Sequence, residues 1–194
     1  MSICTYRAED YIRLPWKNGT GVTDEICLLP EKATRESFEV RVSSAPILTE
    51  GRFSSFPGVE RTIILIEGTE LDLEFDNETT SLEPFQPFTF DTALTPVGKP
   101  RSGPVRVVNM MTNRNQWFVE HTRILTCDTQ LDAAANSKIF IIALNTSWRV
   151  DCAERETTLA PFDSALSDRS VYLSLPHCSD ESPRGLAYVL SPNS

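Results

Sequence analysis

The chain has 194 residues, a hydrophobic fraction of 40% and a formal net charge of −9. This length and composition allow one or two compact domains with a substantial apolar core, and they argue against disorder. The acidic charge and the scattered Lys and Arg residues argue against nucleic-acid binding, which requires clustered cations.

Short segments with strand-like patterns predict a chain made mostly of β-strands. Pro residues outnumber Gly residues by 13 to 8, and helix-length periodic segments are hard to find, which favours strands and turns. The predicted strands are Phe38–Ser43, Ile63–Ile66, Glu70–Phe75, Val105–Met111, Ile139–Leu144, Val171–Leu175 and Leu186–Leu190. Many short strands at this spacing are typical of a β-sandwich or barrel.

A gapless repeat relates two parts of the chain at an offset of 77 residues, and it aligns Arg61–Asp91 with Lys138–Asp168. Each copy contains, after a polar loop, a Leu-x-Pro-Phe segment that we expect to begin a strand, where the missing amide of Pro does no harm. Identical residues at this offset are Ile64 and Ile141, Thr69 and Thr146, Thr80 and Thr157, Leu82 and Leu159, Pro84 and Pro161, Phe85 and Phe162, and Asp91 and Asp168. The repeat predicts an all-β chain with an N-terminal half at 1–112, a connector at 113–136 and a C-terminal half at 137–194. The alternative is a single domain in which the halves share the N-terminal strands.

Polar side chains gather on one face of two early strands. Thr23 and Glu25 share one face, and Arg41 and Ser43 share the polar face of the next predicted strand. A sheet with one face exposed to solvent shows the same alternation of polar and apolar residues. One interpretation is therefore that this polar face is exposed to solvent. If this face lines an enclosed hollow, Arg41 is a buried cation that needs an anionic partner. That partner is then Glu25, Glu67 or the carboxylate of a ligand.

Four motifs in the first 112 residues are distinctive. They are Pro-Trp-Lys-Asn-Gly-x-Gly-x-Thr-x-Glu-Ile (15–26), Arg-Val-Ser-x-Ala (41–45), Gly-x-Phe-Ser-x-Phe-Pro-Gly-x-x-Arg (51–61) and Gly-Pro-Val-x-x-x-Asn-Met-Met-Thr (103–112). These motifs resemble those of the HutD/Ves family. The resemblance implies two tandem cupin-like halves of the RmlC-like jelly-roll type. It also implies bacterial cytoplasmic proteins of histidine utilisation or the stress response, one branch binding an intermediate such as formylglutamate.

The expected ligand is a small anionic metabolite, bound in a regulatory role. We expect Lys17 and Arg41 to hold its anionic group, Trp16 to form an apolar wall, and Asn18 and Asn109 to fix its orientation. The full set of expected ligand-binding residues is Trp16, Lys17, Asn18, Thr23, Glu25, Arg41, Ser43, Arg61, Asn109 and Met111.

A metal-binding cupin supplies two close histidines, a glutamate and a later histidine, because divalent transition metals favour imidazole and carboxylate ligands. The repeat places the paired histidines near Phe53–Phe56, where the sequence is Phe-Ser-Ser-Phe. The chain has two histidines, His121 and His177, which lie far apart in the sequence. We therefore expect no metal site and no cofactor.

No apolar stretch is long enough to span a bilayer, and the N-terminal residues lack the pattern of a signal peptide. We expect a cytoplasmic protein without a membrane partner. In that compartment the five cysteines, which include no C-x-x-C pair, are expected to be reduced thiols.

Two other functions stay open from the sequence. A cofactor-independent isomerase or lyase acting on a small carboxylate would use Glu25 or Glu67 as its base. A protein-interaction module would use its two halves as the surface of a homodimer.

Overall fold

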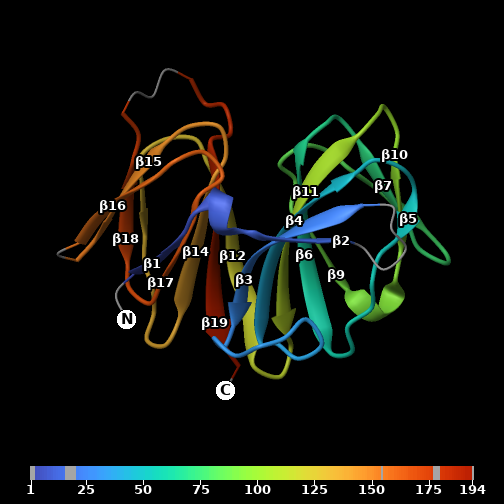
Figure 1. Cartoon of the computed structure of the whole chain (residues 1–194), viewed down its shortest axis with the longest axis horizontal. Coiled ribbons are helices and arrows are strands. Elements are labelled where there is room, and N and C mark those ends of the chain that lie inside the picture. Colours follow the sequence, from blue (N-terminus) through green and yellow to red (C-terminus); the bar gives the residue numbers. More distant parts are fainter. Residues whose placement is uncertain (1–2, 16–20, 154, 177–179, 194) are drawn as a thin grey trace. The chain divides into compact units, whose positions relative to one another are not determined.

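The computed structural model describes residues 3–15, 21–153, 155–176 and 180–193. Its regular elements are strands and short 3-10 helices (Figure 1). The chain divides into a first unit, Ile12–Trp117, and a second unit, Met1–Tyr11 with Phe118–Ser194. Among these described residues, no helix is long and apolar enough to cross a membrane. The predicted all-β architecture is confirmed.

The first unit contains two antiparallel sheets and the short helix η2 (Thr92–Leu94). The strand order of the six-stranded sheet is β2 (Ile12–Pro15), β3 (Val22–Leu29), β4 (Val40–Ile47), β11 (Val105–Asn113), β6 (Val59–Glu67) and β9 (Phe88–Asp91). The strand order of the four-stranded sheet is β5 (Gly51–Arg52), β10 (Val97–Pro100), β7 (Leu71–Glu74) and β8 (Thr79–Leu82).

The apolar core of the first unit is built from both of its sheets. Ile63 and Leu65 of β6 and Val107 of β11 come from the larger sheet, and Leu71 and Leu73 of β7 come from the smaller one. All five are fully buried. Alternate residues of a strand point to the same face, so the spacing of two in β6 and β7 places these side chains toward a common interior.

The second unit has the same two-sheet construction and the short helix η1 (Ala8–Asp10). The strand order of its five-stranded sheet is β1 (Ile3–Tyr6), β17 (Ser164–Ser167), β14 (Lys138–Ala143), β19 (Gly185–Pro192) and β12 (Trp117–Leu125). The strand order of its four-stranded sheet is β13 (Thr129–Leu131), β18 (Val171–Ser174), β15 (Trp148–Cys152) and β16 (Arg155–Leu159). Its interior is occupied by a large apolar cluster that includes the fully buried Trp148.

The predicted repeat corresponds to equivalent hairpins in the two units. β7 and β15 begin 77 residues apart, at Leu71 and Trp148, and β8 and β16 end at Leu82 and Leu159, also 77 residues apart. Both hairpins pair these residues with each other, Leu71 with Leu82 and Trp148 with Leu159. The sequence repeat is therefore a structural repeat.

The two Leu-x-Pro-Phe segments form turns before a strand, whereas the sequence predicted that they begin one. Phe85 and Phe162 have positive φ angles of 62° and 66°. A left-handed backbone is unusual for an aromatic residue, so the same strained turn marks equivalent positions of the two units. The following strands, β9 and β17, start at Phe88 and Ser164.

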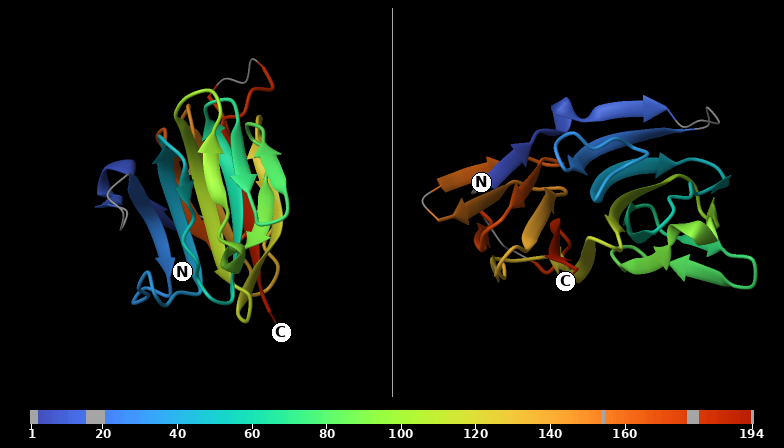
Figure 2. Two further views of the ribbon diagram at one scale, coloured as in Figure 1. Left: turned by 90° about the vertical axis from the view of Figure 1, so that its right-hand side faces the viewer. Right: turned by 90° about the horizontal axis from the view of Figure 1, so that it is seen from below.

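The division into units differs from the predicted one at two places. β1 pairs with β17, so the N-terminal strand belongs to the second unit, where its dark blue ribbon lies beside orange strands (Figure 2). Arg7 Nη1 donates a hydrogen bond to Asp163 Oδ2 at 2.6 Å and holds the segment that follows β1. The stretch 113–136, predicted to be a connector, contains β12 and β13.

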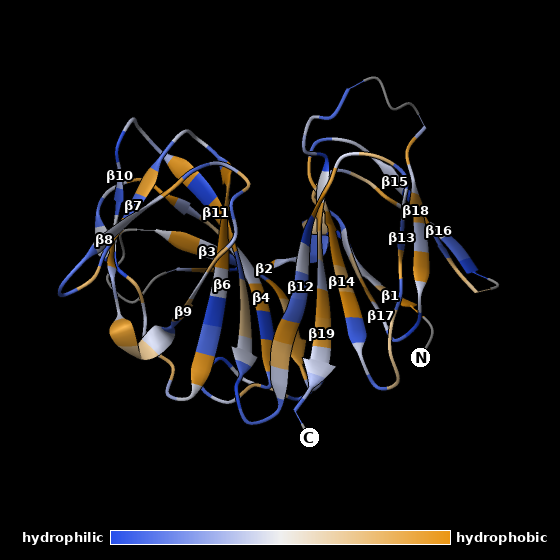
Figure 3. Cartoon of the chain, turned by 180° about the vertical axis from the view of Figure 1, so that it is seen from behind, coloured by the Kyte–Doolittle hydropathy of each residue, from blue (hydrophilic) through white to orange (hydrophobic). Residues whose placement is uncertain are grey.

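Strand β4 is buried on both faces. It begins two residues later than predicted and continues to Ile47. Val40 and Val42 are buried on one face, and Arg41 and Ser43 are buried on the other. Figure 3 shows the corresponding hydrophilic bands on β4 and β6 within otherwise hydrophobic strands. The polar face of β4 therefore meets an interior, and bulk water does not cover it.

Candidate functional site

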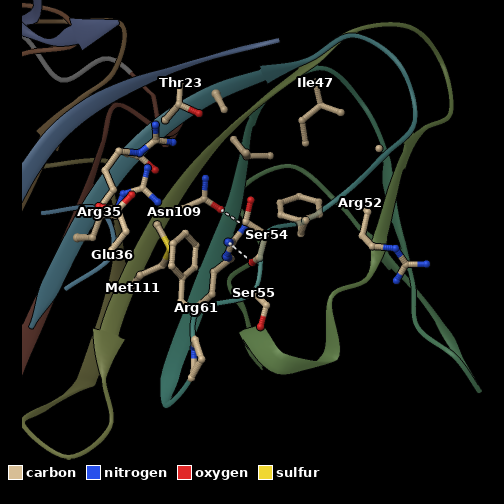
Figure 4. Close-up of a pocket in the computed structure, with 18 residues that line it drawn as sticks. Thr23, Arg35, Glu36, Ile47, Arg52, Ser54, Ser55, Arg61, Asn109 and Met111 are labelled. Carbon is tan, nitrogen blue, oxygen red and sulfur yellow. Dashed lines mark hydrogen bonds between the residues drawn. The ribbon is translucent and has the colours of Figure 1, made fainter. Parts of the chain in front are cut away.

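The first unit contains a cavity of about 360 Å³. Its lining comes from β3, β4, β6 and β11 and from the segment 51–57, which follows β4 and covers the cavity from one side (Figure 4). Among the described lining residues, four are arginines and one, Glu36, is acidic. This balance favours an anion, although the whole chain is acidic.

Strand register brings the polar lining residues together. In the antiparallel ladder, Met111 of β11 lies opposite Arg41 of β4 and opposite Arg61 of β6. The next inward-facing pair along the ladder is Asn109 and Ser43. Because side chains two residues apart share a face, all five point into the same hollow. Each of them is at most 5% exposed.

Arg41 is neutralised within the protein. Its Nε lies 2.9 Å from Oε1 and 3.1 Å from Oε2 of Glu25, and both side chains are buried. The Nε of Arg35 lies 3.8 Å from the same carboxylate. The Arg41 guanidinium carbon lies 5.4 Å from the ring centroid of Phe56, so an aromatic face supports the pair. Arg41 needs no ligand to balance its charge.

Arg61 has aromatic neighbours where Arg41 has a carboxylate. Its guanidinium carbon lies 4.8 Å from the ring centroid of Phe53 and 5.7 Å from that of Phe90. Its Nη1 donates to Asn109 Oδ1 at 3.5 Å, and its Nη2 donates to the Ser54 carbonyl oxygen at 3.4 Å. Both hydrogen bonds are long and therefore weak, and Figure 4 shows them inside the cavity.

The charge of Arg61 is not balanced within the described part of the chain. No carboxylate there lies within ion-pair distance of its guanidinium, and its buried Nε has no hydrogen-bond partner. Burial, and then the nearby Arg41, lower the pKa of Arg61 to about 9, so the guanidinium stays protonated at neutral pH. A buried cation without a counter-ion is costly, and an anionic ligand would remove that cost.

The comparisons with known proteins identify the family. The sequence model of the HutD family matches residues 8–180. The chain belongs to the HutD family. Protein Ves of Citrobacter koseri is 54% identical over 76 residues, which is 39% of this chain and 39% of that protein. The predicted resemblance to HutD/Ves proteins is thereby confirmed.

A solved structure of a HutD protein agrees with this assignment. HutD from Pseudomonas fluorescens SBW25, solved in a formate condition, is 26% identical and has a TM-score of 0.82, with each chain covered completely. Oxalate decarboxylase from Bacillus subtilis is 7% identical, with a TM-score of 0.66 over 97% of this chain and 77% of that one. That second likeness concerns the fold alone, and it supports the predicted cupin-like architecture.

The structure brings together six of the expected ligand-binding residues of this HutD-family protein. Thr23, Arg41, Ser43, Arg61, Asn109 and Met111 line the cavity. Glu25 is not a lining residue, but its carboxylate pairs with Arg41. Glu67, the other candidate base, lies at the end of β6 with a side chain that is 54% exposed, and it pairs with Arg106. Trp16, Lys17 and Asn18 lie outside the described residues.

Several lining residues were not predicted as ligand-binding residues. Arg35 and Glu36 come from the turn before β4, and Phe53 and Phe56 come from the segment after it. The signal for Phe53 and Phe56 was the Gly-x-Phe-Ser-x-Phe-Pro-Gly motif, which carries part of the family resemblance and covers the place where cupin histidines belong. The two phenylalanines lie instead against the two buried arginines.

His121 is not among the residues that line the cavity. His121 is exposed on β12, with its Nε2 3.6 Å from a carboxylate oxygen of Glu120, and His177 lies outside the described residues. Across the described ranges, no cluster of three or more His, Cys, Asp and Glu side chains has a metal-binding arrangement. The donor groups that line the cavity are guanidinium, hydroxyl and amide groups, which suit an oxyanion.

Proposed function

We propose that this HutD-family protein binds a small carboxylate in the cavity of its first unit, in a regulatory role. The observation that carries the proposal is the buried, uncompensated Arg61 at the cavity wall. A carboxylate in the cavity that contacts the Arg61 guanidinium would gain charge-assisted hydrogen bonds and would neutralise the cation. Formylglutamate, the ligand implied by the family resemblance, is one candidate of this class.

Asn109 and Ser43 support the same proposal. The amide of Asn109 already contacts Arg61, and the hydroxyl of Ser43 lies beside it on the neighbouring strand. Both are buried and can donate to a second carboxylate oxygen without rearrangement of the backbone. A preorganised set of donors lowers the entropy that binding costs.

The acid–base alternative has weaker support. Both oxygens of Glu25 lie against the Arg41 Nε, which leaves this carboxylate poorly placed to accept a proton from a ligand. Glu67 is not among the lining residues. The acidic lining residue in the described chain, Glu36, is exposed to solvent. The dimer alternative explains neither the buried cations nor the cavity.

Calorimetric titration tests the proposal. Formate, acetate, glutarate and formylglutamate are titrated into the wild type and into Arg61→Met, which has a similar length but no charge. At least one carboxylate should bind the wild type, and Arg61→Met should lose about 10- to 100-fold in affinity, the range expected for a hydrogen bond to a charged group. Arg123→Met, which removes an exposed arginine of the second unit, is the matched control and should bind normally. Equal affinities of all three proteins would refute the proposal.

A further inference from the structure

The lining of the cavity changes from polar to apolar along the strands that form it. Successive inward-facing pairs of β4 and β11 are Arg41 with Met111, Ser43 with Asn109, and Ala45 with Val107. The polar pairs end there, and Ile47 follows as the next inward residue of β4. The hollow therefore has a cationic end and an apolar end.

The apolar end is part of the unit's hydrophobic core that remains open to the cavity. Ile47 and Val107 belong to the core cluster, and Phe53 packs against it. These three side chains and Ala45 also line the cavity, and both Ala45 and Val107 are at most 5% exposed. A ligand that reaches this end meets carbon atoms of buried side chains.

No charged side chain of the described lining points into the apolar end of the cavity. Arg52 lines the cavity nearby, but it is exposed and its Nη1 donates to the Thr95 carbonyl oxygen at 2.8 Å. Figure 4 shows its side chain pointing away from Asn109 and Arg61. A second carboxylate at the apolar end would lose its hydration without gaining a donor, which is unfavourable.

The spacing of the two ends fits one extended small molecule. Nη1 of Arg61 reaches Asn109, and the Ala45–Val107 pair lies two residues further along the ladder. Two residues of a strand span about 7 Å. A carboxylate on Arg61 can therefore extend a short chain of carbon atoms over Val107 toward Ile47.

The geometry points to a ligand that is a monocarboxylate with a short apolar tail, bound with its carboxylate on Arg61 and its tail against Ala45, Ile47 and Val107. This inference rests on the proposed function and narrows the small carboxylate to one class of ligand. It predicts that an aliphatic monocarboxylate binds more tightly than a dicarboxylate of the same length. Formylglutamate is one of these dicarboxylates.

A chain-length series tests the inference on the unaltered protein. Acetate, propionate, butyrate, valerate and hexanoate are titrated by calorimetry, with glutarate as the dicarboxylate match of valerate and hexanol as the uncharged match of hexanoate. Affinity should rise about fourfold for each methylene that becomes buried, as the transfer of apolar surface from water predicts. Glutarate and hexanol should each bind at least about tenfold more weakly than their matches, because each fails to complement one end of the cavity.

A variant at the apolar end locates the tail. Val107→Thr is close to valine in shape, but it places a hydroxyl at a buried position of the apolar end and is not a conservative change. The ratio of hexanoate affinity to acetate affinity should fall about tenfold in this variant. The same ratio should be unchanged in Arg123→Met.

The outcomes separate the inference from the proposed function. Affinity that depends on Arg61 but does not rise with chain length, or glutarate that binds more tightly than valerate, overturns the inference and leaves the proposed function standing. Affinity that rises with length equally in Arg61→Met overturns the proposed function, because the carboxylate then has no role. If no acid in the series binds, both fail.

Discussion

The guanidinium carbon of Arg61 lies 4.8 Å from the ring centroid of Phe53, which places a buried cation on an aromatic face instead of beside a carboxylate. A cation–aromatic contact of this kind contributes about 2 kcal/mol when it is desolvated, less than burial of the charge costs. The pair is therefore suited to binding an anion more than to stabilising the fold.

Arg61→Met should stabilise the ligand-free protein. The change removes an unpaired charge and an unsatisfied Nε, and the methionine sulfur and methylenes can still contact Phe53 and Phe90. We expect a gain of about 1 kcal/mol in the free energy of unfolding, seen as a rise of about 2–4 °C in Tm. Thermal unfolding without added anions measures it. A loss of more than about 1 kcal/mol would show that the guanidinium is a structural group.

Glu25→Gln should destabilise the first unit strongly. It leaves Arg41 buried without the carboxylate that lies 2.9 Å away, and breaking a buried pair from one side costs about 3–5 kcal/mol. Urea unfolding measures the loss. The double variant Glu25→Gln with Arg41→Met should recover at least half of it. Glu67→Gln, at an exposed carboxylate, should change stability by less than about 0.5 kcal/mol. A Glu25→Gln protein as stable as the wild type would contradict the charge balance described for this pair.

Gly98→Ala should weaken ligand binding through Phe53. A Cβ at Gly98 would lie 2.6 Å from Cε2 of Phe53, so the ring must shift away from β10 and change its contact with Arg61. Loss of that contact should lower carboxylate affinity about two- to fivefold in calorimetric titration. Gly103→Ala is the comparison, because its φ of 107° makes alanine strained while no atom lies within 4 Å. That variant should lose stability and keep its affinity; the opposite pattern would show that Phe53 does not position Arg61.

The second unit should lose stability in acid through Asp163. Burial alone raises the pKa of Asp163, but hydrogen bonds from the Ala8 amide, from Arg7 and from the Ala160 amide lower it on balance. A carboxyl group whose pKa is lower in the folded state stabilises the fold above its unfolded pKa of about 4 and loses this effect as pH falls through the folded value.

Asp163→Asn tests this effect. The variant should be about 2 kcal/mol less stable than the wild type at pH 7, because Asn offers one neutral acceptor where the carboxylate offered two charged ones. The difference should shrink as the pH falls below about 4. Denaturant unfolding at pH 7 and pH 3 measures both values. A constant difference at the two pH values would assign the effect to packing.

The sequence predicted the repeat because each hairpin is a local structure. Leu71 and Leu73, two positions apart and apolar, report a strand with one buried face, and the matching positions 77 residues on repeat that pattern. The boundaries of the units were less predictable. β1 pairs with β17 across most of the chain, and no local pattern near Ile3–Tyr6 encodes a partner so distant.

The sequence located the polar wall of the cavity but not its charge balance. Alternation along β4 shows that Arg41 and Ser43 share a face. The alternating sequence pattern is the same whether that face meets water or a cavity. Burial on both sides of the strand decides between the two. The difference between Arg41 and Arg61 depends on Glu25 from β3 and on Phe53 from a loop, contacts that strand periodicity does not report.

A crystal structure of the protein with bound hexanoate tests the central claim most directly. The carboxylate should lie about 2.7–2.9 Å from nitrogen atoms of Arg61, beside Asn109, with carbon atoms extending over Val107. Hexanoate bound only at the exposed Arg52 or Arg35, with the Arg61 guanidinium untouched, would contradict the claim.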